Sequence, residues 1–388
     1  RDKLKGKGYE IASETDSELI AHLIHLNKTD SSSILEALIK ATKELKGAFS
    51  IAAISAHEKG KIYAAKQKSP LLIGKGIEEN FVASDPLAIA NITEKFYLLE
   101  DGDFAEITKN DIKIFNSNSE PIKREETKID ATPTSTSKGN YTHFMEKEIY
   151  EQPDALGNTI NGRLGENDVL DNIFGLGSSD AFKKVKRIQF VACGTSLHAA
   201  KTARKWFEEI CEIPCYIDFA SEYRYRNPIV EDHTLFVTIS QSGETADTLA
   251  ALEYARAEKY AGIVTICNVP TSTMAREADW KIFTNAGPEI GVASTKAFTT
   301  QLAALLMLAL SIAKSQDKNS DKRKQATQEL RETPALVDQA FTLKENISQI
   351  TKNISTKHNA LFLGRGMYLD VVNLTMSDGE TLNKYFHM

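Results

Sequence analysis

Three short, almost uninterrupted apolar runs, each of them next to a helical segment, place the strongest limit on the fold of this chain. The runs cover residues 188–192, 235–239 and 263–267, and helical patterns follow the first two, at residues 197–210 and up to about residue 257. Strands that are buried on both faces have this composition, and their alternation with helices indicates a parallel sheet with helices on both sides. We therefore predict a doubly wound α/β domain.

The turns after the first two runs carry hydroxyl side chains at the expected starts of helices. Thr195 and Ser196 follow the first run, and Ser240, Ser242 and Thr245 follow the second. Open parallel sheets bind ligands at the carboxyl ends of their strands, and helix N-termini suit phosphate. Because neither turn contains Lys or Arg, we predict a small phosphorylated metabolite held by neutral donors. The alternative is that these side chains only cap helices; two such turns on neighbouring strands favour binding.

Composition argues against several other classes of protein. The 388 residues include 47 basic and 53 acidic side chains, a net charge of −6 without a basic block, so we expect no nucleic-acid or membrane surface. The longest apolar stretch, residues 302–313, is shorter than the roughly 18–20 residues of a membrane-spanning helix. The four cysteines have no zinc-type spacing, and no phosphate-loop or dinucleotide motif is present. We expect a reducing compartment, no metal and no cofactor.

Residues 1–115 have a mixed helix and strand pattern. Thr15 and Glu18 fit a capping box that opens a helix, and strand signals follow at residues 50–54, 62–65 and 81–84. We predict an α+β domain here. Residues 116–140 have no sustained apolar period, which indicates a solvated linker, and helical patterning returns from residue 144.

Three local patterns have two interpretations each. Glu18, His22 and His25 share one helix face and could imitate a metal site, although a solvated face is preferred. Residues 223–226 alternate Tyr and Arg like a stacking platform for nucleic acid, but the net negative charge favours a packed turn. Residues 302–310 are apolar around most of a helix, which predicts a core helix, with a subunit interface as the second use.

Three segments closely resemble the sugar-isomerase (SIS) domain of the glutamine–fructose-6-phosphate aminotransferase family. They are residues 192–196 (Ala-Cys-Gly-Thr-Ser), 240–248 (Ser-Gln-Ser-Gly-Glu-Thr-Ala-Asp-Thr) and 289–299 (Glu-Ile-Gly-Val-Ala-Ser-Thr-Lys-Ala-Phe-Thr). Residues 13–16 and 47–49 are similar to the end of that family's N-terminal-nucleophile glutaminase domain, and residues 147–153 to its interdomain segment. The resemblance covers nearly all of residues 1–366 in the family's order.

The resemblance implies a division of the chain into five parts. Residues 1–115 would be the C-terminal part of a type-2 glutamine amidotransferase domain with αββα layers, and residues 116–180 a linker with an interdomain helical segment. Residues 181–318 would form the first SIS domain, and residues 319–350 a connector helix. Residues 351–388 would be the truncated start of a second SIS domain, with its first strand and a divergent tail.

The resemblance also implies an activity of the hexosamine pathway. The family transfers ammonia from glutamine to fructose 6-phosphate, which yields glucosamine 6-phosphate and glutamate, and the full-length enzyme is expected to be a cytoplasmic homodimer. Motif matching places the phosphate on Ser196, Ser240, Ser242 and Thr245, and the sugar beside Thr195, Gln241, Val292 and Ser294. Asp16 would bind the α-amino group of glutamine; without the family it reads as a plain N-terminal cap residue.

The sequence departs from the family pattern at both ends. The family's glutaminase nucleophile is an N-terminal cysteine, whereas residue 1 is Arg and the first cysteine is Cys193. After residue 366, Asp378, Glu380 and Lys384 do not reproduce the family's helix with lysines and the catalytic glutamate. We therefore assign no catalytic residue, and expect the chain as given to bind sugar phosphate without hydrolysing glutamine or isomerising the sugar.

Two alternative functions stay open. One is a non-catalytic SIS module that senses sugar phosphates, against which the glutaminase-like first zone argues. The other is a different amidotransferase built on the same glutaminase, which would need a phosphoribosyl-pyrophosphate loop that we do not find.

Overall fold

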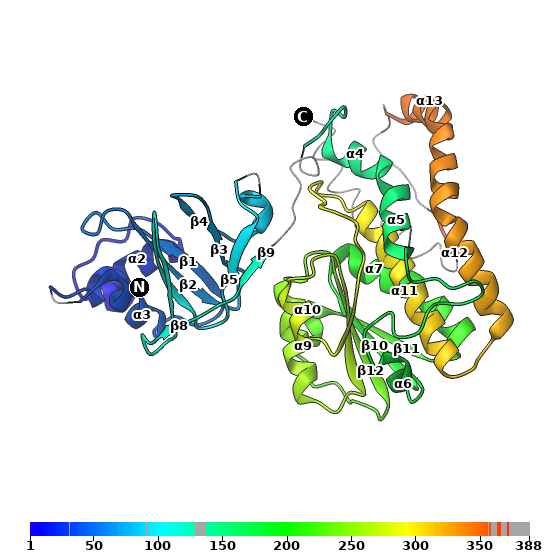
Figure 1. The fold of residues 1–388 in the computed structure, drawn as a ribbon, viewed down its shortest axis with the longest axis horizontal. Helices are drawn as coiled ribbons and strands as arrows, with labels where there is room; N and C mark the ends of the chain where they lie inside the picture. The colour runs from blue at the N-terminus through cyan, green and yellow to red at the C-terminus, as the bar shows by residue number, and fades with distance from the viewer. Residues whose placement is uncertain are drawn as a thin grey trace. The chain divides into compact units, whose positions relative to one another are not determined.

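The computed structural model describes residues 1–30, 32–90, 92–128 and 137–355, together with residues 357, 363–365 and 371. The chain forms two compact units, residues 1–137 and residues 138–388 (Figure 1). The strand predicted at residues 360–363 lies almost entirely outside the described residues, and so does the tail from residue 367.

The first unit contains two antiparallel sheets. The strand order is β1-β2-β6-β7-β8 in one sheet and β4-β3-β5-β9 in the other. Its elements are α1 (Asp2–Lys5), α2 (Asp16–Asn27), α3 (Ile34–Thr42), β1 (Phe49–Ala53), β2 (Lys61–Gln67), β3 (Leu72–Lys75), β4 (Asn80–Ala83), a 3₁₀ turn (Pro86–Ala88), β5 (Lys95–Leu98), β6 (Phe104–Thr108), β7 (Ile112–Phe115), β8 (Pro121–Ile122) and β9 (Glu126–Lys128).

Alternate residues of β2 show how the layers of this unit stack. Tyr63 and Ala65 point into a core shared with α2 and α3, while Ala64 points into a core shared with the second sheet. Successive side chains of a strand face opposite sides of the sheet, so the first sheet lies between the helices and the second sheet. The α+β prediction and the three predicted strands are confirmed.

The start of α2 differs from the prediction. The helix begins at Asp16, but the Thr15 side chain makes no cap bond among the described residues. The Glu18 carboxylate instead accepts hydrogen bonds of 2.6 Å from Ala12 N, Ser13 N and the Ser13 hydroxyl, and lies 3.5 Å from His22. The predicted capping box at Thr15 is therefore wrong, because the Glu18 carboxylate is hydrogen-bonded to Ala12 and Ser13 instead of the Thr15 backbone.

The predicted boundary after residue 115 is too early. Strands β8 and β9 lie within residues 116–128 and extend the two sheets, and the division between the units falls after residue 137. Both strands add to a sheet edge, where one neighbour is sufficient for pairing. An edge strand can therefore be polar, and the polar composition of β8 and β9 made them look like a linker in the sequence.

The second unit is built around one parallel sheet with the strand order β11-β10-β12-β13-β14. Its elements are α4 (Phe144–Tyr150), α5 (Gln152–Ile160), α6 (Ser178–Phe182), β10 (Arg187–Ala192), α7 (Gly194–Trp206), a π-helical turn (Phe207–Cys211), β11 (Cys215–Phe219), α8 (Ala220–Tyr223), β12 (Thr234–Ser240), α9 (Ala246–Ala257), β13 (Gly262–Cys267), α10 (Thr273–Glu277), β14 (Trp280–Phe283), α11 (Lys296–Ser315), α12 (Ser320–Ala340), a 3₁₀ turn (Phe341–Leu343) and α13 (Lys344–Ile354).

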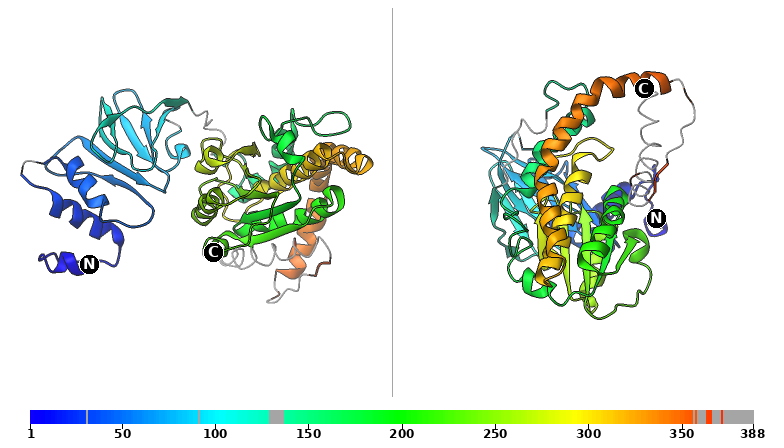
Figure 2. Two further views of the ribbon diagram at one scale, coloured as in Figure 1. Left: turned by 90° about the horizontal axis from the view of Figure 1, so that it is seen from below. Right: turned by 90° about the vertical axis from the view of Figure 1, so that its right-hand side faces the viewer.

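Helices cover both faces of this sheet, as predicted. Figure 1 shows α7 and α11 on one side of the sheet and α9 and α10 on the other. Phe190 of β10 belongs to the large core formed with α5, α7, α11 and α12, and Val191 to a smaller core formed with α8, α9 and α10. The long α12 runs beside α11 (Figure 2). The three apolar runs are the buried strands β10, β12 and β13.

Helix α11 is long and apolar enough to cross a membrane by length and composition alone, but 83% of its most apolar window is buried inside the unit. Leu305, Leu308 and Ile312 are fully buried in the large core. The prediction of a core helix is therefore confirmed.

The segment at residues 223–226 is a packed turn. Tyr223 is fully buried, and its hydroxyl contacts the hydroxyl of Tyr260. Arg224 pairs with Asp247 at 2.7 Å and Arg226 with Asp218 at 2.8 Å. Tyr223 and both guanidinium groups are therefore engaged within the fold, whereas Tyr225 is 79% exposed, so the packed-turn interpretation holds for three of the four residues.

Candidate functional site

The order of the strands creates a cleft at the carboxyl edge of the parallel sheet. After β10 the chain forms β11 on one side of it and then crosses to form β12 on the other side. The neighbouring strands β10 and β12 are therefore followed by helices that pack on opposite faces of the sheet. Such a switch point is the usual ligand site of an open α/β sheet. Here it contains a cavity of about 290 Å³, lined by Cys193, Thr195, Ser196, Ile239, Ser240, Gln241, Ser242, Thr245, Glu289, Gly291, Val292, Ser294 and Gln301. We call it the switch-point cleft.

The structure brings all eight predicted sugar-phosphate residues into this cleft. Thr195 and Ser196 come from the first turn of α7, and Val292 and Ser294 from the irregular loop between β14 and α11. The other four come from the end of β12 and the turn that follows it. Sequence reasoning missed Cys193, Ile239, Glu289, Gly291 and Gln301. The side of the cleft formed by the loop before α11 could be found only from the motif at residues 289–299.

The turn after β12 is organised by its own hydroxyl groups. Ser240 Oγ accepts a 3.0 Å hydrogen bond from Gly243 N and lies 3.0 Å from Thr245 Oγ1, while Ser242 Oγ accepts from Glu244 N at 3.2 Å. Gly243 has φ +68°, and a Cβ atom there would lie 2.2 Å from Ser272 Oγ. Only glycine fits this position, because both the backbone and the space exclude a side chain.

The helices that open at the cleft begin without side-chain caps. Neither Cys193 before α7 nor Thr245 before α9 makes a side-chain cap bond within the described part of the chain. Thr195 and Ser196 already lie in the first turn of α7. The alternative that these hydroxyl residues serve only as N-caps is therefore not supported, and the first-turn N–H groups of both helices stay available for a ligand.

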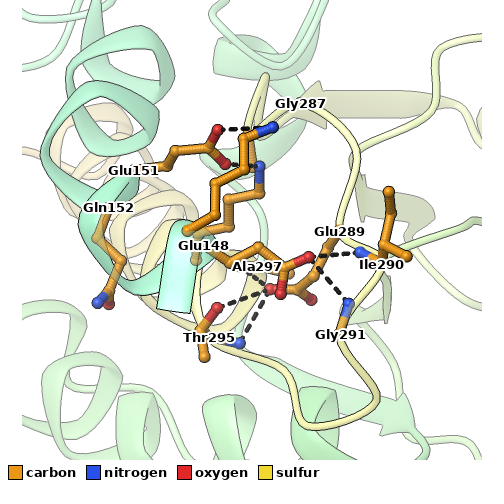
Figure 3. Close-up of polar contacts among 12 residues, drawn as sticks. Glu148, Glu151, Gln152, Gly287, Glu289, Ile290, Gly291, Thr295 and Ala297 are labelled. Carbon is orange, nitrogen blue, oxygen red and sulfur yellow. Dashed lines mark hydrogen bonds and ion pairs between the residues drawn. The ribbon is translucent and has the colours of Figure 1, made fainter. Parts of the chain in front are cut away.

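Two carboxylates hold the loop between β14 and α11, as Figure 3 shows. Glu289 accepts from Ser294 Oγ and Thr295 N at 2.9 Å and from Ala297 N at 3.0 Å. Glu148 of α4 accepts from two backbone N–H groups of the same loop. The exposed Val292 and the half-buried Ser294 therefore stand on a loop that is tied from both sides.

The cleft is polar and lacks cationic side chains. Within the described residues no Lys or Arg lines it, and the Glu289 carboxylate is satisfied at the start of α11. Gln301 is 2% exposed, and its Oε1 has no hydrogen-bond partner in the part of the chain that the structure describes. A buried acceptor beside hydroxyl and N–H donors suits a ligand with both hydroxyl and anionic groups.

A larger hollow of about 450 Å³ lies at the opposite, amino-terminal edge of the sheet. Lys183, Lys184 and Lys186, which precede β10, line it together with His233 and Lys318. The Lys318 ammonium donates to Cys211 O at 2.7 Å and so closes the end of a helical turn. Because sheets of this type place their ligands at the carboxyl edge, the smaller cleft is the better candidate.

Asp16, the predicted glutamine-binding residue, is exposed at the first position of α2. It does not line the cavity of about 210 Å³ in the first unit, which lies between α3 and the first sheet. The structure therefore places Asp16 at the start of a helix, as its sequence context predicts. Among the described residues, this cavity identifies no further side chains that would bind glutamine beside Asp16.

The comparisons with known proteins agree with the fold of the parallel-sheet domain. The family model of the SIS domain matches residues 181–311, the part of the chain that contains the parallel sheet and the cleft. Residues 181–311 of the second unit therefore form an SIS domain.

Similar full-length proteins extend the match beyond this domain. The chain is 44% identical to the glutamine–fructose-6-phosphate aminotransferase (isomerizing) of Vibrio parahaemolyticus and 46% identical to that of Pseudomonas aeruginosa, over 96% of this chain and 61% of each relative. A solved structure of the C-terminal domain of glucosamine-fructose-6-phosphate aminotransferase from Francisella tularensis is 47% identical, with a TM-score of 0.59 over 61% of this chain and 67% of that one. The chain belongs to the glutamine–fructose-6-phosphate aminotransferase family, and it spans about 61% of the length of these curated relatives.

Proposed function

We propose that the switch-point cleft binds fructose 6-phosphate, as part of an enzyme that transfers glutamine-derived ammonia to this sugar and forms glucosamine 6-phosphate. The observation that supports this best is the meeting of two hydroxyl-rich turns at two uncapped helix N-termini. Together these turns and helix ends offer many neutral donors to one anion. The names of the relatives identify fructose 6-phosphate as the sugar phosphate that we propose as the ligand.

The phosphate would lie against Ser196, Ser240, Ser242 and Thr245. Each hydroxyl would donate to a phosphate oxygen, those of Ser240 and Thr245 after giving up the hydrogen bond between them. The N-terminal ends of α7 and α9 add partial positive charge. Such a site holds a dianion without Lys, Arg or metal, and its neutral donors let the ligand exchange. The sugar would then extend toward the loop side of the cleft, beside Thr195, Gln241, Val292 and Ser294.

The first unit would be the C-terminal part of the glutaminase. Its two stacked antiparallel sheets, with α2 and α3 on the outer face of one, support an αββα arrangement. Asp16 would bind the α-amino group of glutamine. Residues 1–137 contain no cysteine, so we expect this chain not to hydrolyse glutamine by itself. A homodimer in the cytoplasm, and the lack of sugar isomerisation by this chain, stay predictions from the resemblance.

Calorimetric titration of the chain with fructose 6-phosphate tests the proposal. Fructose and inorganic phosphate serve as half-ligands, and a parallel titration contains EDTA. We expect tighter binding of fructose 6-phosphate than of either half-ligand, and the same affinity with EDTA present. Equal binding of fructose and fructose 6-phosphate would remove the phosphate site, and loss of binding in EDTA would show that a metal holds the anion.

A further inference from the structure

The loop between β14 and α11 forms one side of the switch-point cleft but has little structure of its own. Residues 284–295 contain no helix or strand, and Ile290 and Val292 are 42% and 69% exposed. A segment with few buried apolar side chains is not held by packing, so its conformation depends on its hydrogen bonds. The hydrogen bonds at Ile290 and Gly291 therefore decide the position of the adjacent Val292, while Ser294 is held by its own bond to Glu289.

Glu148 supplies that support from another element. It lies on α4, is 2% exposed, and its Oε1 accepts hydrogen bonds from Ile290 N at 2.6 Å and from Gly291 N at 2.9 Å (Figure 3). A carboxylate only accepts, which matches two adjacent N–H donors. Hydrogen bonds to a charged acceptor are stronger than those between neutral groups.

The loop is shaped to receive this carboxylate. A Cβ atom on Gly291 would lie 2.5 Å from Glu148 Oε2, so any side chain larger than hydrogen would displace the carboxylate. Gly291 has no positive φ, and its glycine is therefore explained by the approach of Glu148 rather than by backbone strain. Glu148 itself does not line the cleft, whereas Gly291 does.

We infer that Glu148 is a positioning residue for sugar-phosphate binding: it clamps the backbone of residues 290–291 and so holds the adjacent Val292 against the sugar, while Glu289 holds Ser294. This inference rests on the function proposed above. It assigns a role to a buried carboxylate of α4 that contacts the ligand only through the loop.

The test combines four variants with three measurements. Glu148→Ala removes the clamp, Gly291→Ala displaces it, and the double variant carries both changes. Glu146→Ala is the matched control, because Glu146 lies on the same helix and, among the described residues, makes only a 3.8 Å ion pair with Lys344. Hydrogen exchange of the loop amides is measured without ligand, and affinity for fructose 6-phosphate by calorimetry, with the thermal midpoint recorded for each variant.

We expect faster exchange at Ile290 and Gly291 and about tenfold weaker binding in Glu148→Ala. The Gly291→Ala change should weaken binding in the parent but have little further effect in Glu148→Ala, where the clash is gone. A merely structural residue would lower the thermal midpoint without this coupling. Unchanged loop exchange, or additive effects of the two changes on affinity, would overturn the inference. If the parent chain binds no fructose 6-phosphate, the proposed function fails instead, and the loop exchange still decides whether the clamp exists.

Discussion

Ser242→Ala is the sharpest perturbation of the proposed phosphate site. Its hydroxyl lines the cleft and, in the part of the chain that the structure describes, accepts only one hydrogen bond, at 3.2 Å from Glu244 N. Ser240 is 3% exposed and contacts both Gly243 N and the Thr245 hydroxyl. Loss of the Ser242 hydroxyl therefore disturbs the fold less than loss of the Ser240 hydroxyl. Any large effect on binding then reports on the ligand.

The expected magnitude follows from the type of bond. A hydroxyl that donates to a phosphate oxygen makes a hydrogen bond to a charged group, worth ~1.5–3 kcal/mol. At about 1.4 kcal/mol for each factor of ten, the dissociation constant for fructose 6-phosphate should rise roughly tenfold to a hundredfold. The lost neutral contact to Glu244 N should cost stability only ~0.5–1.5 kcal/mol.

Calorimetric titration of the parent and the variant measures this change. Ser221→Ala is the control, because Ser221 follows the edge strand β11, donates weakly to Glu222 at 3.4 Å and does not line the cleft. We expect no change in affinity for the control. Equal affinities of Ser242→Ala and the parent would refute the reasoning that the hydroxyls of this turn hold the phosphate.

Three further results are expected. Gly243→Ala should lower the thermal midpoint of the second unit by roughly 2–8 °C in scanning calorimetry, because a left-handed residue costs ~1–2 kcal/mol and its Cβ would meet Ser272; an unchanged midpoint would contradict the turn geometry. At pH 8, iodoacetamide should alkylate Cys193 of the cleft, and more slowly when fructose 6-phosphate is present. Burial raises the pKa of Cys267 to about 11, so this thiol should stay unreactive. Peptide mass spectrometry that finds Cys267 modified first would be inconsistent with this. The Ser13 hydroxyl and nearby backbone N–H groups lower the pKa of Glu18 to about 2, below the ~4.3 of an unfolded chain. The ionised Glu18 therefore stabilises the folded first unit fully above about pH 4.3, and this stabilisation is lost as the pH falls toward 2. Glu18→Gln should therefore destabilise the first unit at pH 7 but hardly at pH 2, and equal effects on the unfolding midpoint at both values would argue against the network.

Local patterns were sufficient to predict the parts of the site that lie within one strand and its turn. The apolar runs of β10 and β12 predicted buried neighbouring strands, and the hydroxyls at Ser196 and Ser242 predicted donors at helix starts. The general rule for parallel sheets then placed both turns in one cleft, as the structure does.

The remaining parts depend on contacts between distant residues, which periodicity does not contain. Glu148 meets the loop 142 and 143 residues further along the chain, and nothing in its own helix indicates this. Val292 and Ser294 were found only through the family motif, because their loop has no regular period. Edge strands such as β8 and β9 escape detection for a related reason, since their pairing partner, not their composition, makes them strands.

The most direct test of the account is a crystal structure of the chain with fructose 6-phosphate. We predict the phosphate group at the switch-point cleft, with its oxygens at hydrogen-bond distance, roughly 2.5–3.2 Å, from the side chains of Ser196, Ser240, Ser242 and Thr245. The sugar should then lie beside Val292 and Ser294. A phosphate bound instead in the basic hollow beside Lys184 and Lys186, with the cleft empty, would contradict the central claim.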